Sequence, residues 1–486
     1  MNKTLQSIAV VGGGTAGFVS ALILKKKFPF LNISIIHSSK IGTIGVGEGS
    51  TEHWKNFLNF IEVDHTEVFK YCDSTLKCGI MFKDWAEKDY LHSVQVEYNQ
   101  KYGQYSHVYA NIISKNLDSK SMSSKLSWSN QINRWFLDNP GHCPTSQFHF
   151  NTNKLNSWLT SKATQMGISI IDDEIVDVEI KNNGDIGKLF GNKGNYEFDF
   201  YIDSTGFKKL LISKLGANWQ SFSKYLRMKS AIVFPTPDEN NYNNWTLAQA
   251  LDYGWMFRIP VWGRYGNGYI YDSDYINADD AKLEVEKYFG REIEVSKQIN
   301  FDPGALDKVW INNCVAIGLS ASFVEPLEAS SIGTAIQQSF LLMYKLINYD
   351  QTVIDSYNDS CTSITENIRD FIALHYLVDK SNSQFWKDQT QLQIPDSLAT
   401  KLEIWKNRLP ISEDFSKDSR YILFSEDHHI LVLHGLGLFN TDSIRKEYEM
   451  HNSQLKIEAE TILNDNLLHQ DTVARMTHKE YISGYR

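Results

Sequence analysis

Apolar positions near the beginning of the chain change their spacing twice. A continuous apolar run at 8–11 is followed by apolar residues three or four positions apart over 16–27, and a second apolar run occupies 33–36. Short continuous runs are typical of strands buried in a parallel sheet, and the wider spacing is typical of one face of a helix. The pattern therefore predicts a strand, a helix and a second strand in succession.

Predicted strands and helices continue to alternate to about residue 345, and beyond it only helices are predicted. We expect helices over 54–69, 153–163 and 333–346, and strands over 168–180, 188–203, 230–234, 254–260, 268–271 and 315–317. Beyond 345 we expect helices over 364–378, 395–408, 426–435 and 443–468. Residues 86–150 are polar, aromatic-rich and irregular, which indicates an insertion that builds a substrate region. The pattern therefore predicts an α/β core over 1–345 and a helical, substrate-covering subdomain over 346–486.

The glycines between the first strand and the first helix carry a specific chemistry. Gly12, Gly14 and Gly17 fit the pattern G-x-G-x-x-G in the strand–turn–helix setting that makes it informative. The first allows a tight turn, the second lets backbone approach a pyrophosphate, and the third lets the helix pack on the strand. Free N–H groups at the helix start, around Thr15 and Ala16, attract phosphate. We interpret the segment as a dinucleotide site; the alternative is a glycine-rich turn that binds nothing.

Three further segments are expected to border this site. The second strand ends in His37 where an acid usually binds the ribose. The loop at 41–52 is rich in glycine but contains Ile44 and Val46, so we expect it to be buried over a cofactor. An apolar strand ends at Asp203 in the sequence D-x-x-G, which is typical of an edge that contacts a cofactor.

Composition narrows the range of partners. The 486 residues have a formal charge of −10, which argues against nucleic acid and anionic membranes as partners. Five scattered cysteines form neither a zinc pattern nor a secreted disulfide framework. No apolar run reaches the roughly 20 residues needed to span a membrane, and the first strand leaves no room for a signal peptide. We therefore expect a cytoplasmic, reducing compartment.

Single residues are less informative by themselves. Lys77 lies between Leu76 and Cys78 in a strand-like apolar setting. A surface lysine is the ordinary interpretation, whereas a buried lysine would have a lowered pKa and could act as a nucleophile or donor. His428, His429 and His434 are interpreted as a partly exposed helix face rather than as metal ligands, and we expect no bound metal.

Several motifs, taken together and in order, resemble the flavin-dependent halogenases of the tryptophan halogenase type. They are V-G-G-G-T-A-G at Val11, I-G-V-G-E at Ile44, the Lys77 segment through Trp85, F-H-F-N-T-N-K-L at Phe148, I-D-S-T-G-F at Ile202, G-W-M-F-R-I-P at Gly254, G-R-Y-G-N-G-Y-I-Y at Gly263, N-N-C-V-A-I-G-L-S-A-S-F-V-E-P-L-E at Asn312, I-R-D-F-I-A-L-H-Y at Ile368 and F-W-K-D at Phe385. The resemblance implies an FAD-dependent monooxygenase-like core, a Rossmann flavoprotein of the glutathione-reductase type. The cofactor-binding residues it implies, together with those singled out above, are Gly12, Gly14, Thr15, Ala16, Gly17, His37, Ile44, Gly45, Val46, Gly47, Glu48, Asp203, Gly318 and Ile332.

The resemblance also implies a reaction. FADH2, O2 and a halide yield hypohalous acid, which Lys77 would relay to the substrate, while Glu328 would take the proton from the halogenated ring. Glu325, earlier in the same loop, is the alternative acid. With only one dinucleotide motif, reduced FAD is expected from a separate flavin reductase that forms no stable complex. A flavin monooxygenase and a non-catalytic FAD-binding protein remain alternatives on the same scaffold. A homodimer stays open.

Substrate and halide contacts depart from the family pattern. Ser330 and Ser331 stand where Thr-Gly is common and are expected to bind halide through backbone N–H groups. Phe257 replaces the second tryptophan of Trp-x-Trp-x-Ile-Pro, which keeps substrate off the flavin. His107 and Tyr109 resemble the pair that sandwiches an indole, and Trp255 and Pro326 complete the expected substrate residues. The stretch at Phe424 lacks the aromatic cluster that holds free tryptophan, so we expect an indole- or phenol-type arene.

Overall fold

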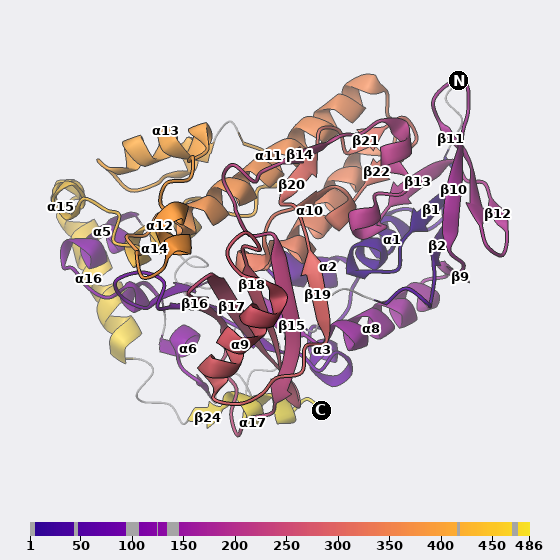
Figure 1. Ribbon diagram of the computed structural model, residues 1–486. Helices are drawn as coiled ribbons and strands as arrows, with labels where there is room; N and C mark the ends of the chain where they lie inside the picture. Colours follow the sequence, from indigo (N-terminus) through magenta and orange to yellow (C-terminus); the bar gives the residue numbers. More distant parts are fainter. Residues whose placement is uncertain are drawn as a thin grey trace.

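A six-stranded sheet carries the glycine motif, with the strand order β21-β22-β13-β1-β2-β9 (Figure 1). The computed structural model describes residues 5–42, 47–93, 106–123, 125–133, 145–415, 418–468 and 475–486. Neighbouring strands run parallel except at β21. The strands are β1 Ser7–Val11, β2 Asn32–His37, β9 Ser169–Asp172, β13 Phe200–Asp203, β21 Trp310–Ile311 and β22 Cys314–Ala316.

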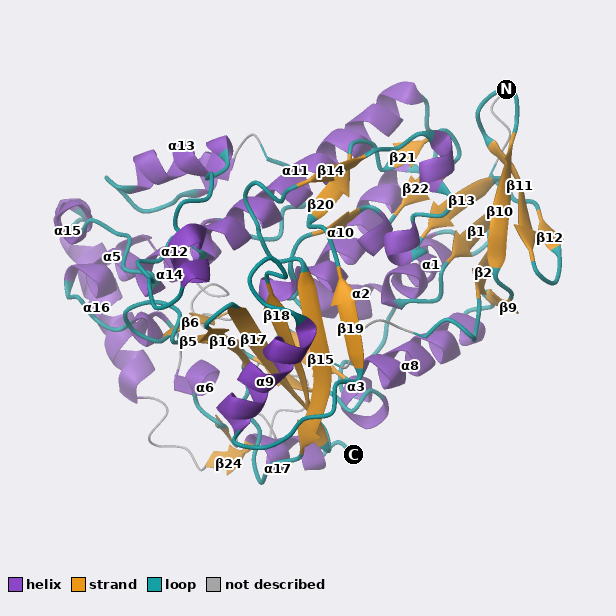
Figure 2. Cartoon of the chain, in the orientation of Figure 1, coloured by secondary structure: helices purple, strands orange, loops and turns teal. Residues whose placement is uncertain are grey.

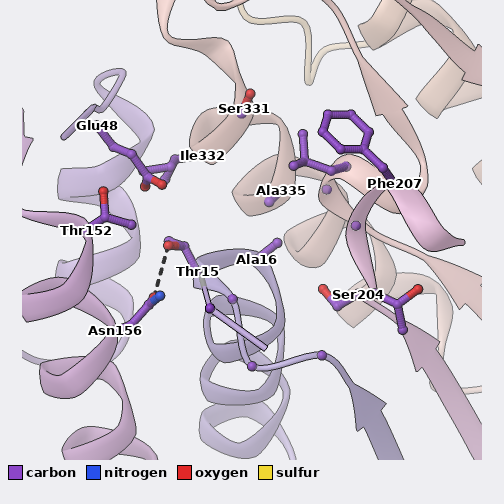
Figure 3. A pocket seen from close by; sticks show the side chains of 18 of the residues that line it. Thr15, Ala16, Glu48, Thr152, Asn156, Ser204, Phe207, Ser331, Ile332 and Ala335 are labelled. Atoms are coloured by element: carbon purple, nitrogen blue, oxygen red, sulfur yellow. Dashed lines mark hydrogen bonds between the residues drawn. The ribbon is translucent and has the colours of Figure 1, made fainter. Parts of the chain in front are cut away.

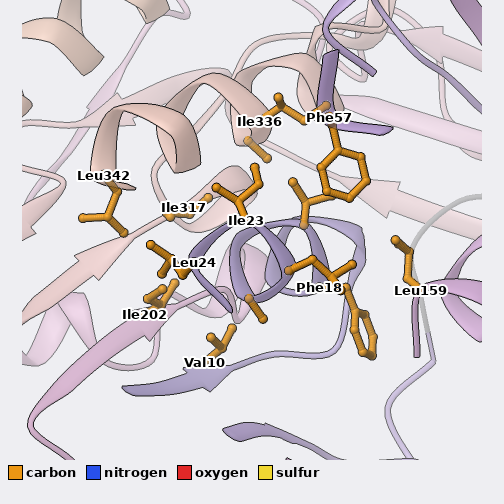
Figure 4. Packing of buried hydrophobic residues seen from close by; sticks show 14 of the residues in the cluster. Val10, Phe18, Ile23, Leu24, Phe57, Leu159, Ile202, Ile317, Ile336 and Leu342 are labelled. Carbon is orange, nitrogen blue, oxygen red and sulfur yellow. The ribbon is translucent and has the colours of Figure 1, made fainter. Parts of the chain in front are cut away.

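Helix α1 (Thr15–Lys27) is central to this layer because it is buried from Gly17 to Leu24. It contacts α8 (Thr152–Gln165) and α10 (Ser330–Lys345). Figure 4 shows side chains of α1, β1, β13 and α10 meeting in one apolar cluster. Burial of this cluster fixes the start of α1 relative to the ends of the strands, where a nucleotide would bind.

A seven-stranded sheet lies beside the first layer, in the order β19-β15-β18-β17-β16-β5-β6. All neighbours are antiparallel except β16 and β5. The strands are β5 Gly79–Lys83, β6 Tyr90–Ser93, β15 Ser230–Pro237, β16 Thr246–Leu251, β17 Gly254–Val261, β18 Arg264–Tyr271 and β19 Lys297–Asn300.

A small sheet, β3-β8-β4, connects the two layers. Its strands are β3 Glu48–Gly49, β8 Gln147–Phe150 and β4 Thr75–Lys77. Lys77 pairs with Gln147 at the end of β4, and β5 of the large sheet begins two residues later. The lysine therefore lies at the junction between the sheets.

The last third of the chain is mostly helical, as expected, and most of its helices lie above and to the left of the large sheet in Figure 2. Its helices are α11 Gln351–His375, α12 Gln384–Gln389, α13 Asp396–Trp405, α14 Glu426–Gly435, α15 Thr441–Met450, α16 Ser453–Leu468 and α17 His478–Ser483. Phe371 of α11 and Trp386 of α12 share one core with Phe82 and Trp255 of the sheet. This apolar core is continuous across residue 345. The division of the chain into a core over 1–345 and a subdomain over 346–486 therefore stays a prediction.

Smaller elements complete the description. The strands are β7 Gln131–Asn133, β10 Ile175–Ile180, β11 Ile186–Gly191, β12 Asn195–Tyr196, β14 Trp219–Ser221, β20 Gly304–Leu306, β23 Ser322–Phe323 and β24 Arg475–Thr477. The helices are α2 His53–Phe60, α3 Glu67–Tyr71, α5 Ser106–Ser114, α6 Lys125–Trp128 and α9 Ala278–Phe289. In the part of the chain described, no helix combines the length and apolar character needed to cross a membrane.

Four expected elements are divided in the structure. The helix over 54–69 is two helices, α2 and α3, because the chain turns through Glu62 at φ 58°. The strand over 168–180 is β9 and β10, in different sheets, since buried Asp173 accepts the N–H of Glu174 and ends β9. Likewise, 188–203 contains β11, β12 and β13, and 443–468 contains α15 and α16.

The sequence analysis also missed regular structure. The expectation of irregular structure over 86–150 is wrong for its described parts, which include α5, α6 and three strands. Strand β16 and helix α9 were not predicted at all. Asn277 caps α9 by accepting the N–H groups of Asp279 and Asp280, a start signal readable from the sequence.

Candidate active site

A cavity of about 790 Å³ opens above the ends of β1 and β13, at the start of α1 (Figure 3). Its wall includes most of the predicted cofactor residues that the structure describes: Gly12, Gly14, Thr15, Ala16, His37, Gly47, Glu48, Gly318 and Ile332. The wall also contains residues that sequence analysis did not single out, among them Asn156, Ser204 and Thr205. Ile44, Gly45 and Val46 lie outside the described residues.

The three glycines of the motif have distinct surroundings. Gly12 has φ +122°, and a Cβ there would lie 2.1 Å from the Ser204 carbonyl oxygen. A Cβ on Gly17 would lie 2.2 Å from the Gly12 carbonyl oxygen, so this glycine permits close packing of the helix start. A Cβ on Gly14 would meet no atom within 4 Å. Gly14 therefore faces open space of the kind that a pyrophosphate needs.

Polar groups of the cavity wall suit a nucleotide. Thr15 Oγ1 donates to Asn156 Oδ1 at 3.2 Å (Figure 3). Burial raises the pKa of Glu48 to about 7 although a bond to Thr15 lowers it, and Glu48 Oε2 has no hydrogen-bond partner among the described residues. A buried carboxylate oxygen without a donor is expected to receive one from a ligand hydroxyl. The glycine cradle and this acid together fit a dinucleotide such as FAD.

Two predicted cofactor residues do not line the cavity. Gly17 acts through packing, as described above. The buried Asp203 carboxylate accepts the N–H groups of Thr205, Leu211 and Ile212 and the hydroxyls of Thr205 and Ser320. These bonds shape the turn after β13, so that Ser204 and Thr205 form part of the cavity wall.

Lys77 is buried, with 1% of its surface exposed. Its Nζ donates to the Ser50 carbonyl oxygen at 2.9 Å. A Cβ on Gly49 would lie 3.5 Å from Lys77 Nζ and 3.2 Å from the Ala329 methyl group, so the amine and the residue after Glu328 flank the same glycine. Burial lowers the pKa of Lys77 to about 8, against the raising effect of Glu328 and Glu52.

Glu328 is buried too, and two imidazoles hold its carboxylate. His92 Nδ1 lies 2.8 Å from Oε2, and His375 Nε2 lies 2.9 Å from Oε1. Burial raises the pKa of Glu328, but the two histidines outweigh burial and hold it well below its usual range. The side chain is therefore an ionised carboxylate at neutral pH, and the two predicted catalytic residues are close enough to interact.

Each of these two imidazoles has a further hydrogen bond on its other nitrogen. Tyr90 OH lies 2.9 Å from His375 Nδ1, and His92 Nε2 lies 2.9 Å from His428 Nδ1. Sequence analysis gave His92 and His375 no role. His375 lies within the motif I-A-L-H-Y that supported the resemblance. A histidine among the apolar residues of a predicted helix was the feature of the sequence that could have identified it.

Glu325, the alternative acid, has a different environment. It is fully buried, and the Tyr376 hydroxyl donates to its Oε1. Burial raises the pKa of Glu325 to about 8, although bonds to Tyr376 and Trp255 lower it. At neutral pH Glu325 is therefore mostly protonated, unlike Glu328.

The predicted halide residues begin α10. Ala329 precedes the helix with φ 53°, a left-handed conformation, and supplies no side-chain cap. Thus the first N–H groups of α10 keep their capacity to bind an anion. Ser331 lines the cavity, whereas Ser330 is buried.

The predicted substrate residues are divided between two places. Phe257 and Pro326 line the cavity, and buried Trp255 lies behind Phe257 with 6.2 Å between ring centroids. His107 and Tyr109 are buried on α5, which contacts α15 and α16; His107 Nε2 lies 3.7 Å from Glu458 Oε2. The described contacts do not bring this pair to Lys77.

The three histidines of α14 were expected to form a partly exposed helix face, and one of them does not. His429 is 1% exposed and packs against Phe371 and Trp405, so the expectation is wrong for it. His428 and His434 are half-buried. Among the described residues, no group of His, Cys, Asp and Glu could hold a metal ion.

Comparison with known proteins agrees with this geometry. Residues 7–450 match the family model described as tryptophan halogenase, a range that ends before β24 and α17. The chain is 29% identical over 451 residues to the 7-chloro-L-tryptophan 6-halogenase KtzR of Kutzneria sp. (strain 744), covering 84% of this chain and 86% of that one. The crystal structure of a tryptophan halogenase from Shewanella frigidimarina NCIMB 400 superposes with a TM-score of 0.88 at 26% identity, covering 100% and 98% of the two chains. Xcc4156, a flavin-dependent halogenase from Xanthomonas campestris, gives 0.87 at 26% identity and 99% of each chain. The chain, with its Rossmann-type flavoprotein core, therefore belongs to the tryptophan halogenase family and is a flavin-dependent halogenase.

Proposed function

We propose that this enzyme uses FADH2, O2 and a halide to halogenate an electron-rich arene, with Lys77 as the relay of the oxidant and Glu328 as the general base. The observation that supports this best is that Lys77 and Glu328 are both buried, with the amine beside Gly49 and with Ala329, the residue after Glu328, against the same glycine of the cavity wall. Gly12, Gly14 and Glu48 would hold the flavin, whose chemistry with O2 and halide supplies hypohalous acid.

Lys77 suits the relay because its pKa of about 8 makes both protonation states accessible near neutral pH. The ammonium can polarise hypohalous acid by hydrogen bonding, and the amine can accept the halogen. Its burial excludes bulk water, which would otherwise dilute the oxidant. Ser50, through its carbonyl oxygen, orients the amine.

Glu328 suits the base because it is ionised and lies near the amine that delivers the halogen. A carboxylate in hydrogen-bond reach of the ring can take the proton that substitution releases. His92 and His428 then offer a route for that proton, since each imidazole has one nitrogen to accept it and another to release it.

The substrate proposed is an indole- or phenol-type arene. Two curated relatives act on chlorotryptophan and tryptophan, as their names state, and electrophilic halogenation requires an electron-rich ring. Phe257 on the cavity wall, backed by Trp255, would keep the organic substrate off the flavin. We place halide at the first N–H groups of α10, and we expect reduced FAD from a separate reductase without a stable complex.

The test is Lys77→Ala, assayed with a flavin reductase, FAD, NADH and bromide on a panel of indoles and phenols, with products identified by mass. We expect halogenation to be lost while FAD binding persists. Lys83→Ala is the matched control, because this half-buried lysine lies in the adjacent strand β5. Halogenated product from the Lys77 variant would overturn the relay, and hydroxylated product without halide would indicate a monooxygenase.

A further inference from the structure

Residues 475–486, which we name the carboxy-terminal strap, return to the core after the helices of the last third. The strap comprises β24 and α17 and lies beside α3 at the foot of the large sheet (Figure 1). β24 pairs with β7, matching Met476 to Ile132. A capping box joins Thr477 and Glu480 at the start of α17, so the first residue of the helix, His478, has a defined orientation.

His478 is fully buried and links two distant backbone groups. Its Nε2 lies 3.0 Å from the Leu76 amide nitrogen, and its Nδ1 lies 3.2 Å from the Asn243 carbonyl oxygen. A carbonyl only accepts and an amide N–H only donates, so Nδ1 carries the proton and Nε2 accepts from Leu76. Burial lowers the pKa of His478 to about 4 although two backbone bonds raise it, which keeps this neutral tautomer at physiological pH.

Leu76 needs such a partner because β4 is an edge strand. Among the strands that the structure describes, β8 alone pairs with β4, which leaves the Leu76 N–H on the open side. A buried N–H without an acceptor is costly. The acceptor comes from 402 residues further along the chain, and Leu76 is the residue directly before Lys77.

The strap also contacts the segment that leads into β4. Arg486 donates to the Phe69 carbonyl oxygen at 2.8 Å and pairs with Asp73 Oδ1 at 3.0 Å. Tyr481 and Ile482 are buried in the same core as Phe69. The strap therefore holds the lysine-bearing segment at two points, before β4 and within it.

We propose that the carboxy-terminal strap positions Lys77 for delivery of the halogen, with His478 as the positioning residue. The inference rests on the proposed relay by Lys77. A strand whose edge N–H has a fixed acceptor holds the amine at the Ser50 carbonyl oxygen, whereas a loosened strand would let the oxidant pass the amine and escape. Displacements of about 1 Å at a reacting group can cost about 100-fold in rate.

The experiment uses the full chain with His478→Leu, which removes the acceptor, and His478→Gln, whose amide can both accept from Leu76 and donate to Asn243. Lys479→Ala is the matched control, because Lys479 lies on the same helix but pairs with Asp238 at the surface. Three quantities are measured: halogenated product per reduced flavin consumed, hypohalous acid captured in solution by a small β-dicarbonyl trap, and hydrogen exchange of a peptide spanning 73–83.

We expect His478→Leu to lower the halogenated product per reduced flavin by about 10- to 100-fold and to raise the amount of trapped hypohalous acid. Hydrogen exchange should become faster in 73–83, whereas exchange in β1 and the affinity for FAD should not change. His478→Gln should restore most of the yield, and Lys479→Ala should behave like wild type. Unchanged exchange in 73–83, or a yield that falls without a rise in trapped oxidant, would overturn the proposal. Lys77→Ala, assayed in parallel, separates the two hypotheses. If Lys77→Ala still gives halogenated product, the proposed relay by Lys77 is wrong. If Lys77→Ala loses the product but His478→Leu does not, the strap proposal alone is wrong.

Discussion

Replacing Lys77 with methionine should abolish halogenation and stabilise the fold at neutral pH. Lys77 is buried, and its pKa falls from 10.5 to about 8. At about 1.4 kcal/mol per pH unit, the folded state carries a penalty of about 3 kcal/mol for the charged amine. Methionine has similar length and no charge to desolvate, so the variant is free of this penalty.

One loss offsets the gain. Lys77 Nζ is the donor to the Ser50 carbonyl oxygen, and leaving that buried acceptor without a donor costs roughly 1–2 kcal/mol. The expected net effect at pH 7 is therefore an increase of about 1–2 kcal/mol in the free energy of unfolding, relative to wild type.

The sign of the pH dependence is the sharper test. A lysine whose pKa is lowered by folding destabilises the folded state fully below pH 8, and the penalty disappears as pH rises toward 10.5. The penalty should fall from about 3 kcal/mol at pH 7 to about 1 kcal/mol at pH 9.5, so the advantage of the methionine variant should shrink by about 2 kcal/mol over this range. Other titrating groups are common to both proteins and cancel in the difference.

Chemical denaturation of wild type and Lys77→Met at pH 7 and pH 9.5 measures this difference. Lys287→Met, at an exposed position of α9, is the control and should show no pH-dependent difference from wild type. A difference between the Lys77 proteins that is independent of pH would refute the reasoning, because it would mean that Lys77 keeps its ordinary pKa.

Three further predictions concern the carboxylates, the glycines and the histidine chain. Glu328→Gln should lower kcat by about 100- to 10,000-fold, as for loss of a general base, whereas Glu325→Gln should cost less than about tenfold because Glu325 is already mostly protonated at neutral pH; steady-state assays with the opposite ranking would contradict the assignment. Gly12→Ala should destabilise the fold by about 1–3 kcal/mol, since its φ is +122° and its Cβ would meet a backbone oxygen, whereas Gly14→Ala should fold normally and bind FAD more weakly, as flavin titration and denaturation can establish. His428→Phe should lower kcat by about tenfold or more and change the solvent isotope effect if the proton leaves Glu328 through His92; an unchanged isotope effect would argue for another route.

Local features of the fold were readable from the sequence. The strand–turn–helix unit around Gly12 and Gly14 was readable because its glycine spacing and the apolar pattern on both sides are local, and most of the described cofactor residues line one cavity. The division of 54–69 into α2 and α3 was not readable, because it depends on a left-handed Glu62 in a segment with helical spacing. Regular structure within 86–150 was missed for a related reason. Helix α5 packs against α15 and α16, and this tertiary packing stabilises the helix although its own sequence shows no strong helical pattern.

The candidate chemistry was only partly readable. The motifs selected Lys77 and Glu328, but their spacing could not distinguish a buried lysine from a surface one. Glu328 obtains its ionised state from His92 and His375, which come from β6 and α11. The assignment of His107 and Tyr109 to the substrate site stays a prediction; the structure shows both residues buried on α5, which packs against α15 and α16.

The sequence by itself determined the strand–turn–helix unit around Gly12, the change to mostly helical structure near residue 345, and the choice of Lys77 and Glu328 as candidate catalytic residues. The tertiary structure decided that Lys77 is buried, that Glu328 is charged and that an imidazole from residue 478 completes the edge of β4. The physical reason is range: glycine turns and helix periodicity follow from bonds between neighbours, whereas burial and pKa depend on which segments, hundreds of residues apart, come together.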